Sequence, residues 1–322
     1  MKPIGGYFEL ELTDQRSSLH SDAFYVNSGR NALEFILRTM DRIPAKVYLP
    51  YYTCDTVFEP LQRLRIPYEF YNIKEKLELV DLIHLKPDEY IIVNNYFGLQ
   101  DDYIRYLYGK YQDQLIIDCT QAWYTPEIKG CKMFYSPRKY FGLPDGGIAC
   151  TTISKNIELE EDKSYTRCEH LLRRIDEGAQ KGYGAFQENS EKLVNLPLRW
   201  MSRLTKALLS SIDQDHVRQT RIHNYEYLYS LLKDINKFEA PSADKFALSG
   251  CPMVYPFLSQ DTNLRKKLIA NNIFVATYWP NVIEMGKKGS IEYNVASNLI
   301  PLPIDQRYGE EEMIRIINLI KK

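Results

Sequence analysis

The stretch that decides the fold is QLIIDCTQAWYTPEIKGCKMFYSPRKYFGLPDGG, residues 114–147. It holds two short apolar runs, 114–119 and 131–136, and each run carries a polar side chain at or next to its end, Asp118 and Ser136 respectively. Continuous apolar runs of this length, bounded by turn residues, are typical of strands buried on both faces of a sheet. Because ligands of such sheets bind beyond the carboxyl ends of the strands, the stretch predicts a covered sheet with a site at one edge.

The same alternation fills the first half of the chain. The helix expected at 29–42 has an apolar stripe with the spacing of one helix face, formed in part by Leu33, Ile36 and Leu37. The other expected strands are 23–27, 46–50, 68–73, 90–95 and 147–152, and the other expected helices are 54–63 and 101–111. Strands that alternate with helices predict an α/β fold, with a mixed, mostly parallel sheet between helices.

The composition of the chain changes after residue 153, where the regular alternation of expected strands and helices ends. We expect residues 155–182 to be charged and mostly helical, and residues 186–235 to form two or three helices, broken at Pro197 and capped at Asp213. Further strands are expected at 253–258 and 273–277, and further helices at 262–271 and 310–321. The predicted organisation is an N-terminal arm (1–22), a large domain (23–212) and a small C-terminal α+β domain (213–322).

Composition argues against several classes of protein. Lys and Arg number 41 and Asp and Glu number 42, a net charge of -1, so the chain has no basic excess with which to hold a nucleic acid. No window of about 18 apolar residues predicts a membrane span. The N-terminus lacks a basic segment followed by an apolar run, so we expect no signal peptide and a cytoplasmic location.

The cysteine, histidine and tyrosine content bears on disulfides, metal binding and aromatic packing. None of the six cysteines forms a C-x-x-C pair, and the five histidines are scattered singly, so we expect reduced thiols and no metal site. The 25 tyrosines have two interpretations: rings packed in the core and at subunit contacts, or rings around a bound planar or sugar ligand.

Lys139 lies in the loop between two expected core strands, three residues after Ser136 and shortly before Gly146 and Gly147. This position suits a lysine that forms a Schiff base with an aldehyde. An amine forms an imine only when unprotonated, and burial beside another cation favours the unprotonated form. Arg138 is a candidate for that cation, although its side chain could equally point away.

Two further features suit pyridoxal 5'-phosphate (PLP), an aldehyde cofactor with a pyridine ring. Asp118 offers a carboxylate that keeps the ring nitrogen protonated, so that the ring takes up carbanion charge. Ser136 offers a hydroxyl for the phosphate, and residues 28–31 (SGRN) open a helix whose free N–H groups form a phosphate site. Each feature alone also has a structural interpretation, as a solvated lysine, a turn aspartate or a helix cap. Their order along the chain favours the joint chemical interpretation.

The order of five motifs resembles the DegT-type sugar aminotransferases, which are fold-type-I PLP enzymes. The motifs are SGRNAL (28–33), LPYYTC (49–54), NNYFG (94–98), IIDCTQAW (116–123) and SPRKYFGLPDGG (136–147). Segments 216–232, 264–280 and 299–320 are similar to the family's small domain and the helix that leads into it. The resemblance therefore covers most of the chain and implies the PLP-dependent transferase fold of type I.

The resemblance implies a role for each matching residue. Lys139 matches the catalytic Schiff-base lysine and Asp118 the catalytic partner of the pyridine nitrogen. Further cofactor contacts are implied for Gln121 against the ring and its hydroxyl, Ser136 on the phosphate, Gly29 and Arg30 at the family's Gly-Thr pair, and Cys54 where the family often has a stacked aromatic ring.

Three departures from the family's pattern concern cofactor binding. Arg30 stands in place of the usual Thr, and Cys54 in place of a ring that Tyr51, Tyr52 or another aromatic residue could replace. Residues 181–187 are the loose counterpart of a segment that sends an Asn to the neighbouring subunit's phosphate, and they contain no Asn.

The resemblance implies transfer of an amino group, with glutamate as the expected donor, to a keto-sugar attached to a nucleotide, in cell-surface polysaccharide or amino-sugar biosynthesis. Lys139 argues against the family's dehydratase relatives, which carry a His there. Two alternatives stay open: another PLP reaction, such as a lyase or a non-sugar transamination, and an inactive relative that acts as a binding subunit. A homodimer with a shared site is expected, and the arm at 5–12 has the alternating pattern of an exposed strand that could pair with a partner.

Overall fold

A seven-stranded sheet is the largest element of the computed structural model, which describes residues 6–13, 19–20 and 22–321. The strands are β1 (Phe24–Val26), β2 (Lys46–Pro50), β3 (Tyr68–Tyr71), β4 (Glu89–Asn94), β5 (Leu115–Cys119), β6 (Lys132–Tyr135) and β7 (Gly147–Cys150). Their order is β1-β7-β6-β5-β4-β2-β3. Strands β2 to β6 run parallel, whereas β7 pairs antiparallel with both β1 and β6. The predicted α/β class with a mixed, mostly parallel sheet is confirmed.

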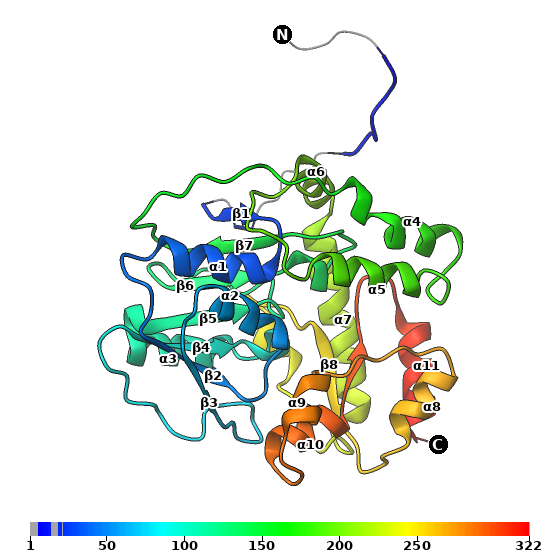
Figure 1. Ribbon diagram of the computed structural model, residues 1–322. Helices are drawn as coiled ribbons and strands as arrows, with labels where there is room; N and C mark the ends of the chain where they lie inside the picture. Colours follow the sequence, from blue (N-terminus) through cyan, green and yellow to red (C-terminus); the bar gives the residue numbers. More distant parts are fainter. Residues whose placement is uncertain (1–5, 14–18, 21, 322) are drawn as a thin grey trace.

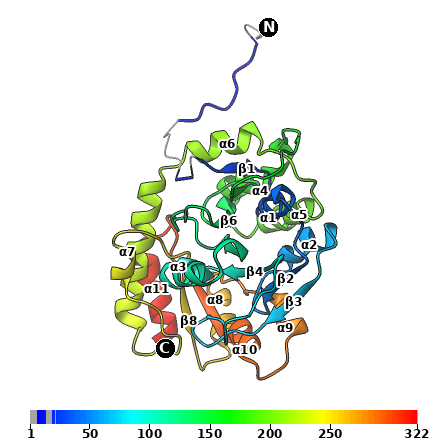
Figure 2. The ribbon, with the colours of Figure 1, turned by 90° about the vertical axis from the view of Figure 1, so that its left-hand side faces the viewer.

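Helices cover both faces of this sheet. In Figures 1 and 2, α1 (Gly29–Thr39) and α2 (Phe58–Arg63) lie on one side of it, and α3 (Asp101–Tyr111) and α7 (Gln214–Leu232) lie on the other. Successive residues of a strand point to opposite faces. Accordingly Ile116 packs in the apolar cluster that contains α1, while Ile117 packs in the cluster on the opposite face. This double burial explains why the strands read as continuous apolar runs.

The C-terminal third forms a second, smaller unit of sheet and helices. Its strands β8 (Val254–Leu258) and β9 (Leu299–Pro303) pair antiparallel. Its helices are α8 (Leu264–Ala270), α9 (Pro280–Met285), α10 (Ile291–Asn298) and α11 (Glu310–Lys321), and three further helices, α4 (Glu169–Asp176), α5 (Tyr183–Lys192) and α6 (Arg203–Ser210), precede α7. The predicted boundary at residue 212 stays a prediction, but Asp213 does cap α7, since its side chain accepts a hydrogen bond from the His216 N–H.

Many of the tyrosine rings are packed in the core of this fold. Tyr52, Tyr96, Tyr135, Tyr225 and Tyr255 are among the largest fully buried side chains. Several of their hydroxyls donate to backbone carbonyls, as from Tyr96 to Tyr52 at 2.6 Å. Satisfying the phenolic O–H in this way makes burial of the ring favourable. These contacts favour the packing interpretation of the tyrosine content.

Two predicted elements are wrong. Residues 155–164 contain no helix, because they run past the edge of the sheet, where the Asp162 N–H donates to the Trp200 carbonyl at 3.0 Å. Residues 273–277 are not a strand, because β8 takes its only described partner, β9, from residues further along the chain, and Phe274 is left half exposed. Within the described part of the chain, helices long and apolar enough to cross a bilayer are absent.

The N-terminal arm is described only in part. Residues 6–13 form no strand and extend away from the rest of the chain in Figure 1. Tyr7 and Phe8 are almost fully exposed. Gly5, the first residue of the predicted alternating strand, lies outside the described residues.

Candidate active site

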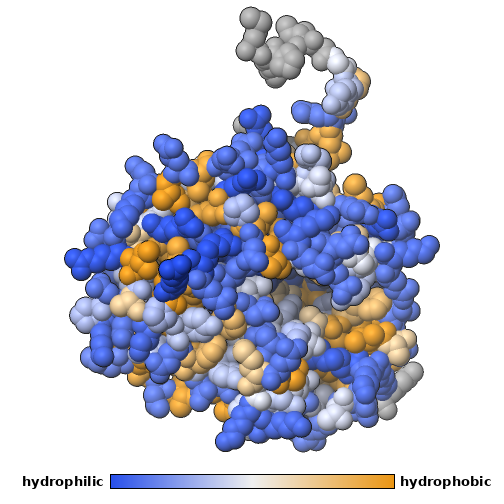
Figure 3. Space-filling model, viewed as in Figure 1, coloured by the Kyte–Doolittle hydropathy of each residue, from blue (hydrophilic) through white to orange (hydrophobic). Residues whose placement is uncertain are grey.

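Six of the seven predicted site residues line one cavity, which lies beyond the carboxyl ends of β5 and β6 and beside the start of α1. They are Gly29, Arg30, Cys54, Asp118, Ser136 and Lys139. Figure 3 shows the surface hollowed near the centre of the view, in the region where Figure 1 places α2 and α5. The fold thus gathers residues that lie up to 110 positions apart, from Gly29 to Lys139, around one space.

Lys139 and Asp118 meet through Thr120. The Lys139 Nζ donates to the Thr120 Oγ1 at 3.0 Å, and the Thr120 N–H donates to the Asp118 Oδ1 at 2.8 Å. Asp118 is buried at the end of β5, and burial raises the pKa of its carboxyl group, while the positive charge of Lys139 opposes that shift. The cavity therefore holds a carboxylate and a primary amine close together, as the sequence predicts.

The start of α1 is built against the loop that carries Lys139. The Ser28 hydroxyl caps the helix by accepting from the Asn31 N–H at 3.2 Å. A Cβ on Gly147 would lie 2.1 Å from the Ser28 carbonyl oxygen, so only glycine permits this approach of the two backbones. A Cβ on Gly29 would in turn lie 3.2 Å from the Ser136 Cβ. The free N–H groups at the start of α1 therefore lie beside the Ser136 side chain.

Two arginines line the cavity and differ in their partners. Arg30 forms an ion pair with Glu59 of α2. Arg138 forms no ion pair within the described residues, and burial lowers the pKa of its guanidinium group to about 10, an effect that the nearby charge of Arg30 reinforces and Asp145 opposes. At neutral pH Arg138 remains a cation. Of the two orientations considered for Arg138, the structure has the side chain at the cavity.

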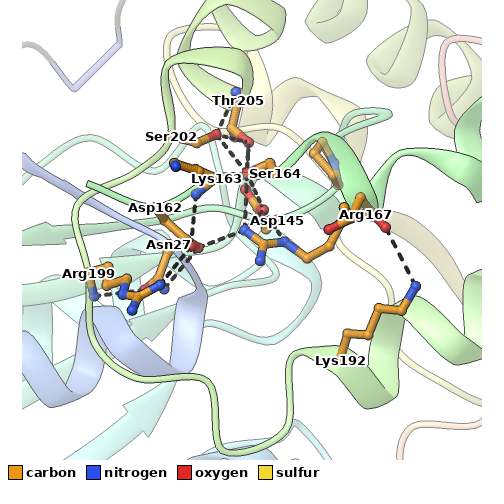
Figure 4. Close-up of polar contacts among 12 residues, drawn as sticks. Asn27, Asp145, Asp162, Lys163, Ser164, Arg167, Lys192, Arg199, Ser202 and Thr205 are labelled. Atoms are coloured by element: carbon orange, nitrogen blue, oxygen red, sulfur yellow. Dashed lines mark hydrogen bonds and ion pairs between the residues drawn. The ribbon is translucent and has the colours of Figure 1, made fainter. Parts of the chain in front are cut away.

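A buried polar network fixes the loop that follows Lys139 (Figure 4). Asp145 is fully buried, and its carboxylate accepts hydrogen bonds from Arg167 at 2.7 Å, Ser164 at 2.5 Å and Thr205 at 2.5 Å. Arg167 also donates to Asp162 at 2.6 Å. Because each charge in the network is paired, the loop is held in one arrangement by two separate segments, 162–167 and the start of α6 at Thr205.

Gln121 is the predicted site residue that does not line the cavity. It is buried, its Oε1 accepts from the Phe97 N–H at 3.3 Å, and its Nε2 has no hydrogen-bond partner. The unpaired buried amide is a donor without an acceptor in the ligand-free chain. Its predicted contact with the cofactor stays a prediction.

Of the aromatic residues considered for the place beside Cys54, the structure brings others than the two named tyrosines to the cavity. Tyr51 and Tyr52 do not line it: the Tyr51 hydroxyl donates to the Met285 carbonyl, and Tyr52 packs on the Trp279 ring at a centroid distance of 4.9 Å. Phe134 of β6 and Trp279, which precedes α9, do line it, together with Cys54. Burial raises the pKa of the Cys54 thiol, and Lys139 opposes that shift.

Sequence reasoning missed Thr120 and Trp279. Thr120 follows Asp118 by two residues, and the position of a hydroxyl just past a strand end could have suggested it. Trp279 belongs to the C-terminal unit, and no spacing in the sequence connects it with a cavity built mainly from residues 28–146.

The residues present fit PLP. The start of α1, Ser136 and two arginines supply donors and positive charge for a phosphate, Asp118 supplies a buried carboxylate for a pyridinium nitrogen, and Lys139 supplies the amine. The observation that carries this fit is that the anion-binding groups, the carboxylate and the amine all border the same cavity.

Comparison with solved structures supports the same fold. DesV of S. venezuelae, in complex with a ketimine intermediate, is 18% identical; the match covers 93% of this chain and 84% of that one, with a TM-score of 0.61. AtS13 of Actinomadura melliaura is 16% identical, over 93% and 86% of the two chains, with a TM-score of 0.62. NtdA of Bacillus subtilis with bound cofactor PMP is 13% identical, over 93% and 73%, with a TM-score of 0.61.

These likenesses confirm the fold class, that of the fold-type-I PLP-dependent enzymes. CalS13 of Micromonospora echinospora, described as a sugar aminotransferase, is 17% identical over 93% of this chain and 86% of that one, with a TM-score of 0.59. No protein-family model matches the chain, and no curated protein matches it.

Proposed function

We propose that this protein is a PLP-dependent aminotransferase that transfers an amino group, with glutamate as the expected donor, to a nucleotide-linked keto-sugar. The observation that carries the reaction class is the placement of Lys139 and Asp118 at one cavity, joined through Thr120. The sugar class rests on the resemblance in the motifs and on solved structures of the same fold, such as the sugar aminotransferase CalS13. Amino-sugar or cell-surface polysaccharide synthesis is the corresponding setting.

Bound PLP supplies an aldehyde for amine exchange and a ring that takes up carbanion charge. Asp118 would hold a proton on the ring nitrogen, because a buried carboxylate is stabilised by pairing with a cation. Lys139 would move a proton at the substrate carbon with its Nζ, as general base and then general acid. Thr120 orients both groups through its hydroxyl and its backbone N–H.

The two alternatives are distinguished by simple measurements. A lyase or other PLP reaction would leave the cofactor unconverted to its amine form by glutamate or any other amino donor. An inactive binding subunit would be purified without PLP and would fail to take it up. The presence of both the amine and the carboxylate at the cavity favours an active enzyme over the binding subunit.

We also propose a homodimer that completes the site at the subunit boundary. Two observations support it: the exposed apolar side chains of residues 7–12, and the exposed apolar face of α4 and α5. Residue Leu193, directly after α5, lines the cavity, so a subunit docked on this face would lie near the site. The cytoplasmic location stays a prediction.

The test of the reaction class is Lys139→Ala. The wild type, loaded with PLP, should show a visible absorption band that borohydride bleaches with mass added at Lys139, and glutamate should shift that band. Lys139→Ala should lose the covalent adduct and lower turnover of a nucleotide keto-sugar by at least about a thousandfold, because the Schiff base and the proton shuttle are lost together. Turnover at the wild-type rate by Lys139→Ala would end this mechanism. The control is Lys155→Ala, at an exposed residue that does not line the cavity.

A further inference from the structure

Arg138 is the cation at the cavity whose guanidinium group has no partner among the described residues. It lies in the single turn Pro137–Lys139, directly before Lys139, and its side chain lines the cavity. Within the described residues it forms no ion pair and no hydrogen bond through its guanidinium group. It is therefore a cation without a counter-ion.

The neighbouring arginines are paired, which makes Arg138 the exception. Arg30 pairs with Glu59, and Arg167 pairs with Asp145 and Asp162. Asp145 lies close enough to raise the pKa of Arg138, but its oxygens already accept from Arg167, Ser164 and Thr205. Asp145, the carboxylate that raises the pKa of Arg138, is thus already occupied by other partners.

Arg138 is half-buried, and burial lowers the pKa of its guanidinium group, so the charged form is less favourable in the ligand-free chain than in water. A bound anionic ligand would provide the Arg138 guanidinium with the counter-ion that the described residues do not supply. Ser136 precedes the turn that carries Arg138, and the start of α1 lies against Ser136, so a hydroxyl, free N–H groups and a guanidinium border the same cavity. This donor set suits a phosphate monoester, which the planar guanidinium fork binds through two parallel hydrogen bonds.

We propose that Arg138 binds the phosphate group of the cofactor and completes, with Ser136 and the start of α1, a phosphate site built within one subunit. The inference rests on the proposed PLP function. It also accounts for the missing Asn in residues 181–187: the donor that the family takes from the neighbouring subunit is replaced here by a charged group of the same chain. Lys139 follows Arg138 directly, so one turn would hold both the phosphate and the aldehyde of a single small molecule.

The experiment compares PLP with pyridoxal, which lacks the phosphate. Both are titrated into wild type, Arg138→Gln, Arg138→Lys and the control Arg203→Gln, whose side chain is 89% exposed, with the visible band as readout. Arg138→Gln should weaken PLP binding by at least about tenfold, which corresponds to about 1.4 kcal/mol, and leave pyridoxal binding within about twofold. The PLP affinity of Arg138→Lys should lie between those of the wild type and Arg138→Gln, since lysine keeps the positive charge but lacks the two parallel N–H donors of the guanidinium group. Arg203→Gln should match the wild type for both ligands.

Thermal unfolding of the cofactor-free proteins separates this role from a structural one. Arg138→Gln should be at least as stable as the wild type, because it removes a half-buried charge that has no partner and whose pKa burial lowers, and inorganic phosphate should raise the Tm of the wild type but not of Arg138→Gln. A lower Tm for cofactor-free Arg138→Gln, or equal weakening of PLP and pyridoxal, would show that Arg138 is structural.

Uridine diphosphate distinguishes the other source of phosphate. If Arg138→Gln lost affinity for this nucleotide and kept its affinity for PLP, Arg138 would bind the substrate, and the inference would be wrong. If the wild type formed no visible band with PLP, the proposed function would fail together with the inference. A normal wild-type band with an unchanged ratio of PLP to pyridoxal affinity in Arg138→Gln would contradict the inference alone.

Discussion

Asp118 shows how one buried residue links the chemistry of the site to the stability of the chain. Its carboxylate accepts a hydrogen bond from Thr120 and lies near the charge of Lys139, but burial dominates and raises its pKa. In the ligand-free protein the ionised form is therefore unfavourable. A cofactor with a protonated ring nitrogen removes that cost, so the same burial that destabilises the free protein strengthens cofactor binding.

Asp118→Asn should accordingly stabilise the cofactor-free protein at pH 7, by about 1 to 3 kcal/mol. The pKa of Asp118 is higher in the folded chain than the 3.8 of an unfolded one, so wild-type stability falls as pH rises from 3.8 through the folded value. The gain in Asp118→Asn should be full at pH 7 and shrink as pH falls toward 4. Denaturant unfolding across this range measures it, with the exposed Asp81→Asn as control.

The opposite result would be equally clear. If cofactor-free Asp118→Asn were less stable than the wild type at pH 7, attraction to Lys139 would outweigh burial. The PLP-bound variant should in either case react more slowly with glutamate, because Asn holds no proton on the ring nitrogen.

At the scale of elements, helix α4 packs against α5 through His170, and burial favours the neutral form of this histidine. His170 is 7% exposed, its ring packs edge-on against Phe186 of α5, and its Nδ1 has no hydrogen-bond partner. Burial lowers its pKa, and the charge of Arg138 lowers it further, while a backbone hydrogen bond to Arg167 opposes both. Protonation of His170 therefore opposes the docking of α4 on the domain that holds the cavity.

Acidification should loosen this contact. The pKa of His170 is lower in the folded chain than the unfolded value of 6.5, so its contribution to stability is present above pH 6.5 and is lost as pH falls below it through the folded value. His170→Gln cannot titrate, so its Tm should fall less than that of the wild type between pH 7 and pH 5, by a few °C, the shift that about 1 kcal/mol produces in a chain of this size.

The exposed His84→Gln serves as the control and should follow the wild type. Parallel acid profiles for wild type and His170→Gln would show that His170 does not link α4 to pH. Hydrogen exchange of the α4 amides would then locate whichever segment opens first.

At the scale of the whole molecule, α4 and α5 present an apolar face that the single chain leaves uncovered. Leu172, Ile175, Tyr183 and Phe186 are 60%, 82%, 57% and 44% exposed. Leu172 and Ile175 lie three residues apart on α4, and the Tyr183 and Phe186 rings stack on α5 at 6.2 Å, so each helix contributes one face. Exposed apolar groups that gather in this way indicate a protein interface.

The protein should therefore be a dimer at micromolar concentration, measured by light scattering. Ile175→Lys should shift it toward monomer and weaken the dimer by at least about tenfold, because a charge would be buried in the interface. Leu248→Lys, at a side chain 99% exposed beyond α7, should leave the dimer intact. A wild-type monomer at that concentration would contradict the proposed assembly, and loss of PLP affinity with the dimer would show that the partner completes the site.

The sequence by itself determined the fold class and most of the cavity. Short apolar runs define strands because both faces of the sheet are buried, and the parallel order places Asp118 and Ser136 at the same edge. A local signal also predicted Asp213 as a helix cap, since capping depends on neighbouring residues alone. The strand expected at 273–277 failed because a strand exists only when another strand pairs with it, and apolar composition does not show whether one does.

Only the tertiary structure decided which side chains meet. It brought Trp279 of the C-terminal unit to the cavity in place of Tyr51 or Tyr52, kept Gln121 out of the lining, and paired Arg30 with Glu59 while leaving Arg138 unpaired. These outcomes depend on distances between residues remote in sequence. Periodicity and spacing encode each residue's local surroundings, whereas charge pairing and cavity lining arise from contacts formed when the whole chain packs.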